Sequence, residues 1–230
     1  MKFLIITFAI AGAFAAIPSL DLRTGDENVE LGSVITDLIN KTINSLIENL
    51  DEPLVLDDIN VDENSEGLSG TIDVTNIKIS GLKSLVATYI DVNLISKIMN
   101  ITIHIPDINL QFAANVDVVL AELIPLYGAG KNSIDLSEIE LTITGLIDIH
   151  DLKHIKVQDV GVLIHLDSAT FNFNGLLNNV EFTALINTML TDNVAAFIND
   201  NDALLSKVLG QIIEDIVNQN TTMENFESFP

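Results

Sequence analysis

The stretch DINVDENSEGLS, which begins at Asp58, carries side-chain oxygens at the spacing of a calcium-binding loop. Asp58, Asn60 and Asp62 stand at the first, third and fifth positions of an EF-hand loop. Such a loop also needs glycine at its sixth position and a bidentate glutamate at its twelfth. The chain has Glu63 and Ser69 at these two positions. The sequence therefore predicts a solvated acidic loop rather than a calcium site.

Two histidines, His150 and His154, flank the turn HDLKH, and such a turn can bring two imidazoles near one metal ion. A closed zinc site needs four ligands, and no third ligand is evident beside this pair. A polar hairpin is therefore the simpler interpretation. His104 and His165 each alternate with apolar neighbours, which predicts that they point to the surface. We predict no metal site.

The chain also lacks the patterns of a catalytic centre. Cysteine is absent, which excludes thiol catalysis, disulfides and Cys-ligated zinc. The tetrapeptide GLSG at 67–70 does not have the spacing of the G-x-S-x-G nucleophile elbow. Glu138 and Glu140 share the polar face of a strand, so we expect them to favour solubility rather than act as acid and base. The sequence predicts neither an enzyme nor a cofactor.

Three N-x-S/T sequons remain, at Asn40, Asn100 and Asn220. Asn40 lies off the apolar side of a helical pattern, and Asn100 stands between the apolar residues Met99 and Ile101 of a strand pattern. Both asparagines are therefore expected to face solvent. In a secreted chain, such positions predict N-glycosylation.

The start of the chain predicts secretion. Lys2 is followed by an apolar run of about ten residues and by the small-residue pattern Ala-Phe-Ala at 13–15. The run is shorter than the roughly 20 residues that a membrane helix requires. We therefore predict a signal peptide at 1–15 and a single extracellular domain at 16–230, without a transmembrane anchor.

Composition and charge exclude several partners. Hydrophobic residues make up 48% of the chain, aromatic residues only 5%, and Trp is absent, so the interior is mostly aliphatic. Ten Lys and Arg stand against 33 Asp and Glu, which gives a net charge of −23. Such a surface repels nucleic acid phosphates and anionic lipid headgroups, so neither is expected as a partner. We interpret the charge as keeping a very apolar chain soluble.

The elements that must position any site follow from periodicity. Paired apolar residues from Ser33 to Leu50 predict an amphipathic helix with Ser33 as its N-cap, and an acidic loop follows at 51–66. Because the later connections are too short for crossover helices, we expect an antiparallel meander. Alternating apolar runs predict its strands at 68–80, 85–95, 98–113, 115–124, 133–149 and 155–173.

Several of these strands change phase once. In ITIHIPDINLQF (101–112), the apolar residues fall on odd positions up to Ile105 and on even positions from Ile108. In a flat strand, a one-residue slip would turn the later side chains to the opposite face. We therefore predict a β-bulge at Pro106 that bends the sheet and keeps Ile105 and Ile108 on one face. Similar phase changes follow Val74, Leu136 and Val157.

A paired apolar stripe of helical period runs from about Asn179 to Asn218, and residues 199–202 are a possible interruption. Because the stripe is about two residues wide, most of the helix surface near the core is expected to be covered. The predicted fold class is α+β: a strongly curved antiparallel sheet wrapped around a long C-terminal helix, with an N-terminal amphipathic helix.

Four segments carry a family resemblance: GLSGTIDVTNIKISGLKSL (67–85), LIPLYGAGKNSIDLSEIELTITG (123–145), VQDVGVLIHLDSATFNFNGLLNN (157–179) and the ending ENFESFP. Together with the order of elements, they resemble the secreted insect takeout and haemolymph juvenile hormone-binding family. The usual N-terminal cysteine pair of that family is missing. The cysteine-free acidic chain is also similar to the related mite group 7 allergens.

The resemblance implies a tunnel for a small lipophilic ligand such as a terpenoid or a fatty acid, between the helix and the inner face of the sheet. We predict a secreted carrier without catalysis. The positions that combine inward phase with large or pliable side chains are the predicted contacts: Ile103, Ile105, Leu110, Phe112, Phe171, Phe173, Ile186, Met189 and Phe197. The alternative is an acidic secreted structural or interaction protein with a filled core and no ligand.

Overall fold

The structure is a computed structural model that describes the central part of the chain. The described residues are 36–37, 39–41, 43–45, 47–65, 68–120, 124–151 and 154–220. The predicted signal peptide and the predicted N-cap Ser33 lie outside the described residues.

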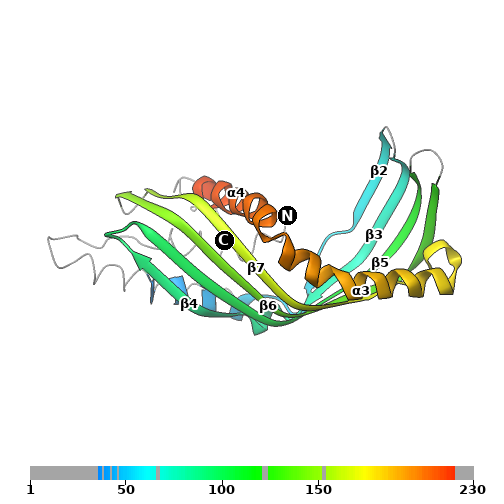
Figure 1. The fold of residues 1–230 in the computed structure, drawn as a ribbon, viewed down its shortest axis with the longest axis horizontal. Coiled ribbons are helices and arrows are strands. Elements are labelled where there is room, and N and C mark those ends of the chain that lie inside the picture. The colour runs from blue at the N-terminus through cyan, green and yellow to red at the C-terminus, as the bar shows by residue number, and fades with distance from the viewer. Residues whose placement is uncertain are drawn as a thin grey trace.

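Within the described residues, seven strands form one antiparallel sheet (Figure 1). Their bounds are β1 Leu54–Val55, β2 Ile59–Ser65, β3 Leu68–Ser80, β4 Val86–Asn93, β5 Ile98–Leu120, β6 Ile124–Asp151 and β7 His154–Asn172. The order is β1-β3-β5-β6-β7, with β2 also paired to β3 and β4 also paired to β5. β4 pairs with residues 98–104 of β5, whereas β3 pairs with residues 109–120. The expected antiparallel pairing is confirmed.

Three predictions about strand boundaries are wrong. The strand predicted at 133–149 is longer, because β6 already begins at Ile124. Residues 98–120 of the two predicted strands 98–113 and 115–124 form the single strand β5, which pairs with β6 almost continuously. The predicted acidic loop 51–66 contains β1 and β2, and β2 pairs with β3 over its whole length. Backbone pairing with a neighbouring strand outweighs the weak strand preference of Asp, Asn and Glu, and an edge strand tolerates charged side chains.

The phase of β5, β6 and β7 changes along one line across the sheet, which we call the crease. It runs through Pro106, Glu138 and Asp167, which are unpaired while the register on either side stays the same. Pro106 has no N–H to donate to the ladder, and Glu138 adopts a φ of 52°. Each of the three strands therefore has one residue outside the ladder at the crease. The inward-facing positions change there from odd to even numbers, or from even to odd, in all three strands together.

The prediction that Ile105 and Ile108 share a face is confirmed, because Ile108 packs against the buried cluster that contains Ile105. The prediction of a β-bulge at Pro106 is wrong, since neither β5 nor β6 carries an extra residue there. Register shifts do occur after Thr75 in β3 and opposite Asp159 of β7, as the phase changes predicted. The sheet is strongly bent, so that its two ends rise on either side (Figure 1).

The helices follow the predicted order. All described residues between 36 and 49 are helical, and Ile39 and Ile43 in this N-terminal helix are 0% and 2% exposed. At the other end of the chain, α3 spans Val180–Asp200 and α4 spans Asp202–Asn220, so the predicted interruption is confirmed. Asn179 caps α3, because its side chain accepts a hydrogen bond from the Phe182 N–H at 2.9 Å.

The crease divides the inner face of the sheet, which is the face that carries the buried cluster, into two halves. The filled half comprises β4 and the parts of β5, β6 and β7 on its side of the crease. Its residues Ile101, Ile103 and Ile105 are 0%, 1% and 3% exposed. They belong to one cluster with the N-terminal helix, and Leu209 and Ile213 of α4 pack against it. The other half, which comprises β3 and the remaining parts of β5, β6 and β7, is called the aromatic half.

α3 and α4 run along β7, the last strand in the order, and polar side chains hold them there (Figure 1). Asn187, Asn199 and Asn218 each accept a bond from the N–H and donate one to the C=O of a single residue, at 2.9–3.0 Å. The residues bound in this way are Phe173, Leu166 and Val157, in that order. Thr191 and Ser206 each accept one further backbone bond. This seam satisfies backbone groups that an edge strand otherwise leaves open.

The fold class is confirmed, but the prediction that most of the helix surface is covered is wrong. The helices lie against one edge strand, so the sheet packs on only one side of them. Among the described residues, seven large apolar side chains of α3 and α4 are exposed: Val180, Leu185, Met189, Phe197, Leu204, Val208 and Ile212. Among the described residues, none of the helices is both long and apolar enough to cross a membrane.

Candidate ligand-binding face

A row of apolar side chains crosses the aromatic half of the sheet. Ile79 of β3 pairs with Leu110 of β5, Leu110 pairs with Ile134 of β6, and Ile134 pairs with Phe171 of β7. Directly opposed residues in antiparallel strands place their side chains on the same face. All four residues are only half-buried. The sequence prediction omitted Ile79 and Ile134 because it favoured large or pliable residues, although their phase in the strands marks the same face.

Three phenylalanines form an aromatic cluster at one end of this row. The ring centroids of Phe112 and Phe173 lie 6.3 Å apart and those of Phe171 and Phe173 lie 5.7 Å apart, both edge to face. Each ring is half-buried. Edge-to-face contact stabilises aromatic pairs beyond the burial of their area. The cluster is therefore held in place by its own contacts while part of its surface stays uncovered.

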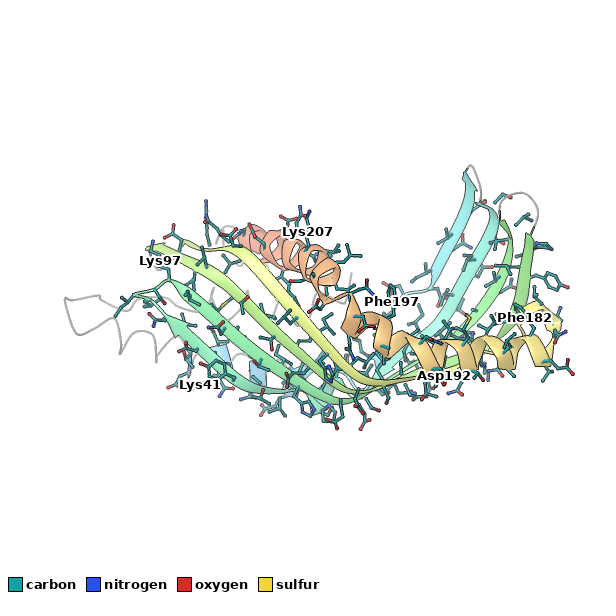
Figure 2. All side chains as sticks on the ribbon, viewed as in Figure 1. Lys41, Lys97, Phe182, Asp192, Phe197 and Lys207 are labelled. Carbon is teal, nitrogen blue, oxygen red and sulfur yellow. The ribbon has the colours of Figure 1, made fainter. Side chains whose placement is uncertain are left out.

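α3 is fixed beside the aromatic cluster. Asn187 binds both backbone groups of Phe173, so the neighbouring Ile186, which is half-buried, lies at the level of the cluster. Figure 2 marks Phe182 at the end of α3 beside the rising strands and Phe197 where α3 approaches α4. The helix therefore spans the length of the aromatic half and ends near the filled half.

The segment Gly128-Ala129-Gly130 explains how the chain turns from β7 into α3. A Cβ on Gly128 would lie 2.2 Å from the Gly175 carbonyl oxygen, and one on Gly130 would lie 2.5 Å from the Asn174 carbonyl oxygen. The turn therefore presses its backbone onto β6 where only glycine leaves space. Asn132 is buried at 9% exposure, donates to the Gly130 carbonyl and accepts from the Asn174 N–H. This contact holds the turn between β7 and α3 against β6.

The structure separates the nine predicted contact residues into three groups. Leu110, Phe112, Phe171 and Phe173 come together on the aromatic half, and Ile186 lies beside them. Ile103 and Ile105 lie across the crease among the residues of the filled half. Met189 and Phe197 lie on α3 and are 50% and 61% exposed.

Polar and charged groups are kept off the inner face. Along β5, β6 and β7 the inward positions are aliphatic, aromatic or glycine, apart from the buried amide of Asn132. Among the described residues, no buried side-chain nitrogen or oxygen lacks a hydrogen-bond partner. The face therefore offers apolar contact and shape rather than polar groups.

The residues that suggested metal or acid-base chemistry lie elsewhere. Glu140 pairs with His104 on one side and with His165 on the other, on the face opposite the inner one, and His104 Nε2 contacts Glu138 Oε2 at 2.7 Å. The described residues contain no group of three or more His, Asp or Glu placed to hold a metal ion. The side chains of the His150 and His154 pair lie outside the described residues.

Two of the sequons lie on described surface. Asn40 is exposed on the N-terminal helix. Asn100 is half-buried in β5, between Met99 and Ile101, which are buried on the inner face, so it points to the outer one. The side chain of Asn220 lies outside the described residues. Glycosylation at all three stays a prediction.

Comparisons with known proteins place this fold. The chain matches the family described as haemolymph juvenile hormone binding protein (JHBP) over residues 4–227. Its structure is similar to that of Takeout 1 from Epiphyas postvittana, with a TM-score of 0.53, 19% sequence identity, and coverage of 85% of this chain and 92% of the other. A lipopolysaccharide binding protein gives a TM-score of 0.35 at 13% identity, with coverage of 80% and 36%. No curated protein matches the chain in sequence.

Proposed function

Because the chain belongs to the haemolymph juvenile hormone binding protein family, we propose that it is a secreted carrier of a small lipophilic ligand. The ligand lies against the inner face of the aromatic half, beside α3. The contact residues we propose are Leu110, Phe112, Phe171, Phe173 and Ile186. Ile103 and Ile105 support the face from across the crease, and Met189 and Phe197 lie where a ligand would pass α3.

The observation that carries this proposal is the half-burial of the aromatic cluster and its row. A monomeric protein seldom leaves a continuous apolar surface uncovered unless that surface binds something. Here the same sheet buries Ile101 completely on one side of the crease and leaves Leu110, Ile134 and Phe171 only partly buried on the other. A lipophilic molecule would complete the second half as the N-terminal helix completes the first.

The expected affinity suits a carrier that releases its ligand rather than a protein that retains it permanently. Burying about 400 Å² of apolar ligand surface is worth roughly 10 kcal/mol before the costs of association. Those costs remove several kcal/mol, so we expect dissociation constants in the micromolar range or somewhat tighter. One methylene more or less changes affinity by only about 1–3 kcal/mol, so chain length alone gives modest selectivity.

The test is binding of the uncharged fluorescent probe N-phenyl-1-naphthylamine to the purified secreted chain. We expect saturable micromolar binding, weakened about tenfold by Phe112→Ala, a loss comparable to one good aromatic contact. The matched control is Leu163→Ala. Leu163 is 51% exposed on the opposite face of the sheet, so this substitution removes apolar surface outside the proposed site. Equal effects of the two substitutions, or no binding below about 100 μM, an affinity of only around 5 kcal/mol, would contradict the proposal.

Extraction of protein purified from its own source provides an independent check. Native mass spectrometry should show a bound species that organic solvent removes. A chain that carries no lipid but retains a basic protein partner at low salt would instead favour the alternative role as an acidic interaction protein.

A further inference from the structure

We propose that the free edge of β2 docks a basic, extended segment of a protein partner, which joins the sheet as a further strand. This segment has Lys or Arg on alternate residues and apolar side chains between them. β2 lies at the opposite edge of the sheet from β7 and α3. The proposal therefore concerns a second surface and does not depend on the ligand of the aromatic half.

The free edge of β2 is regular, unlike the other edges in the described part of the sheet. The asparagine seam occupies the edge of β7, and β1 has only two residues. β4 pairs with β5 through a register shift between Ala87 and Tyr89, an irregularity that discourages a further strand. β2 pairs with β3 over seven residues without a shift, and no described strand lies on its other side. Its outer backbone groups are therefore available to a further strand.

The side chains of β2 determine which strand would fit. Ile59 and Val61 pair with apolar residues of β3 on the inner face and are 50% and 40% exposed. Asn60 and Asp62 alternate with them, point to the outer face and are exposed. Neighbouring strands place opposed side chains on the same face. An added strand would therefore need apolar residues beside Ile59 and Val61 and polar residues beside Asp62.

The charge around β2 selects a basic segment. Residues 51–76 contain eight Asp and Glu and no Lys or Arg. Asp58 accepts a hydrogen bond from the Asn76 N–H at 3.1 Å, and Asp73 accepts one from the Asn60 side chain. These described partners are neutral amides, which leave the carboxylate charge in place. Lys or Arg on the outer face of the added strand would be attracted to this charge, whereas Asp or Glu would be repelled.

The same charge argues against a second copy of this chain as the occupant. Two β2 strands that paired with each other would bring their acidic segments together, and like charges on opposed strands are destabilising. The net charge of −23 on each copy would add to this repulsion. The partner is therefore a different protein that carries a basic segment.

The experiment uses an acetylated and amidated peptide that is as long as β2 and alternates Lys with Val, at about 0.15 M salt. Fluorescence anisotropy measures its binding, and hydrogen exchange followed by mass spectrometry locates it. We expect saturable binding and slower amide exchange in residues 59–65. A peptide of the same sequence that is N-methylated at each backbone amide keeps its charges but cannot donate hydrogen bonds, so it should bind about tenfold more weakly.

Equal binding of the two peptides would overturn the proposal, because charge alone would then attract them. It is also overturned if the first peptide does not bind below about 1 mM, or if slower exchange is confined to residues 108–112 and 169–173. Self-association of the chain that protects residues 59–65 without any peptide would assign this edge to a second copy instead.

One charge reversal at the edge provides a matched comparison. Asp62→Lys places a cation opposite the Lys side chains of the peptide and should weaken binding about fivefold. Asp192→Lys makes the same change of net charge at an exposed position of α3 (Figure 2) and should stay within about twofold of wild type. Equal weakening in both variants would show that net charge sets the affinity and would overturn docking at β2. Circular dichroism checks that both variants fold, and the two peptides test the wild type without them.

Discussion

The two halves of the inner face are built from the same kind of sequence and reach different states of packing. In the filled half, Ile101 and Ile103 are almost completely buried, because the N-terminal helix and α4 both contribute to the cluster around them. In the aromatic half, Leu110 and Phe171 occupy equivalent inward positions and are only partly buried, although Val118 and Ala169 of the same half are buried. An alternating strand therefore defines an apolar face but does not determine what covers it. The covering element, or its replacement by a ligand, decides between core and binding surface.

The largest expected effect contrasts one truncation in each half. Ile101→Ala should lower the free energy of unfolding by about 4 kcal/mol, because it leaves a cavity in a packed core. Leu110→Ala should cost about 1–2 kcal/mol, since its side chain is only partly removed from water. Urea unfolding followed by circular dichroism measures both. Equal losses would mean that the two halves are packed alike.

A second test concerns the close approach of α4 to the filled half. A Cβ on Gly210 would lie 1.9 Å from the Val160 carbonyl oxygen, so Gly210→Ala must push α4 away from β7. We expect a net loss of about 2 kcal/mol in stability, although alanine in a helix interior normally gains about 1 kcal/mol over glycine. Gly145→Ala is the control, because its nearest contact is an ordinary 3.4 Å from a Val160 methyl group. Stabilisation of α4 by Gly210→Ala would show that the helix is not seated there.

The seam along β7 crosses both halves, and Asn199 is its central member. Asn199→Ala leaves the N–H and the C=O of Leu166 without their side-chain partner. We expect a loss of about 1–3 kcal/mol in unfolding free energy and faster amide exchange at Leu166. Asn193→Ala serves as control, because the Asn193 side chain is exposed and bonds only within its own helix, to the Met189 carbonyl. Unchanged exchange at Leu166 would argue that water replaces the amide without cost.

The smallest expected effect on either half is that of the predicted sugars. Enzymatic deglycosylation should lower the mass of protein secreted by an animal cell, and Asn40→Gln and Asn100→Gln should each remove one glycan. Since both residues lie off the inner face, probe binding should stay within about twofold of wild type, roughly 0.4 kcal/mol. An unchanged mass would mean that these sequons are not used.

Much of the fold could be predicted from the sequence, because the alternation of apolar residues is a local property of the chain. Alternation located β3, β4 and β7 to within about two residues at their ends but began β6 at residue 133 instead of Ile124. The phase change at Pro106 placed Ile105 and Ile108 correctly on one face. Alternation within one strand could not predict which strands pair with one another. The unpaired residue Glu138 that accompanies Pro106, and the pairing of the acidic β2 with β3, depend on neighbouring strands rather than on local composition.

The candidate site could be predicted only in part for the same reason. Phe112, Phe171 and Phe173 were identified by phase and size, and the structure brings their rings together. Ile103 and Ile105 have the same phase, but periodicity does not reveal that the N-terminal helix covers them. Met189 and Phe197 belong to a stripe two residues wide, of which the sheet covers only one side.

The most direct test of the central claim is photo-crosslinking with an uncharged long-chain alcohol that carries a diazirine near the middle of its chain. After irradiation of the wild-type complex, peptide mass spectrometry should find adducts concentrated in 108–112, 134–136 and 169–173, and unlabelled alcohol in excess should abolish them. Adducts confined to residues 98–105 of the filled half, or to the exposed apolar side of α3 and α4, would contradict the assignment of the ligand to the aromatic half.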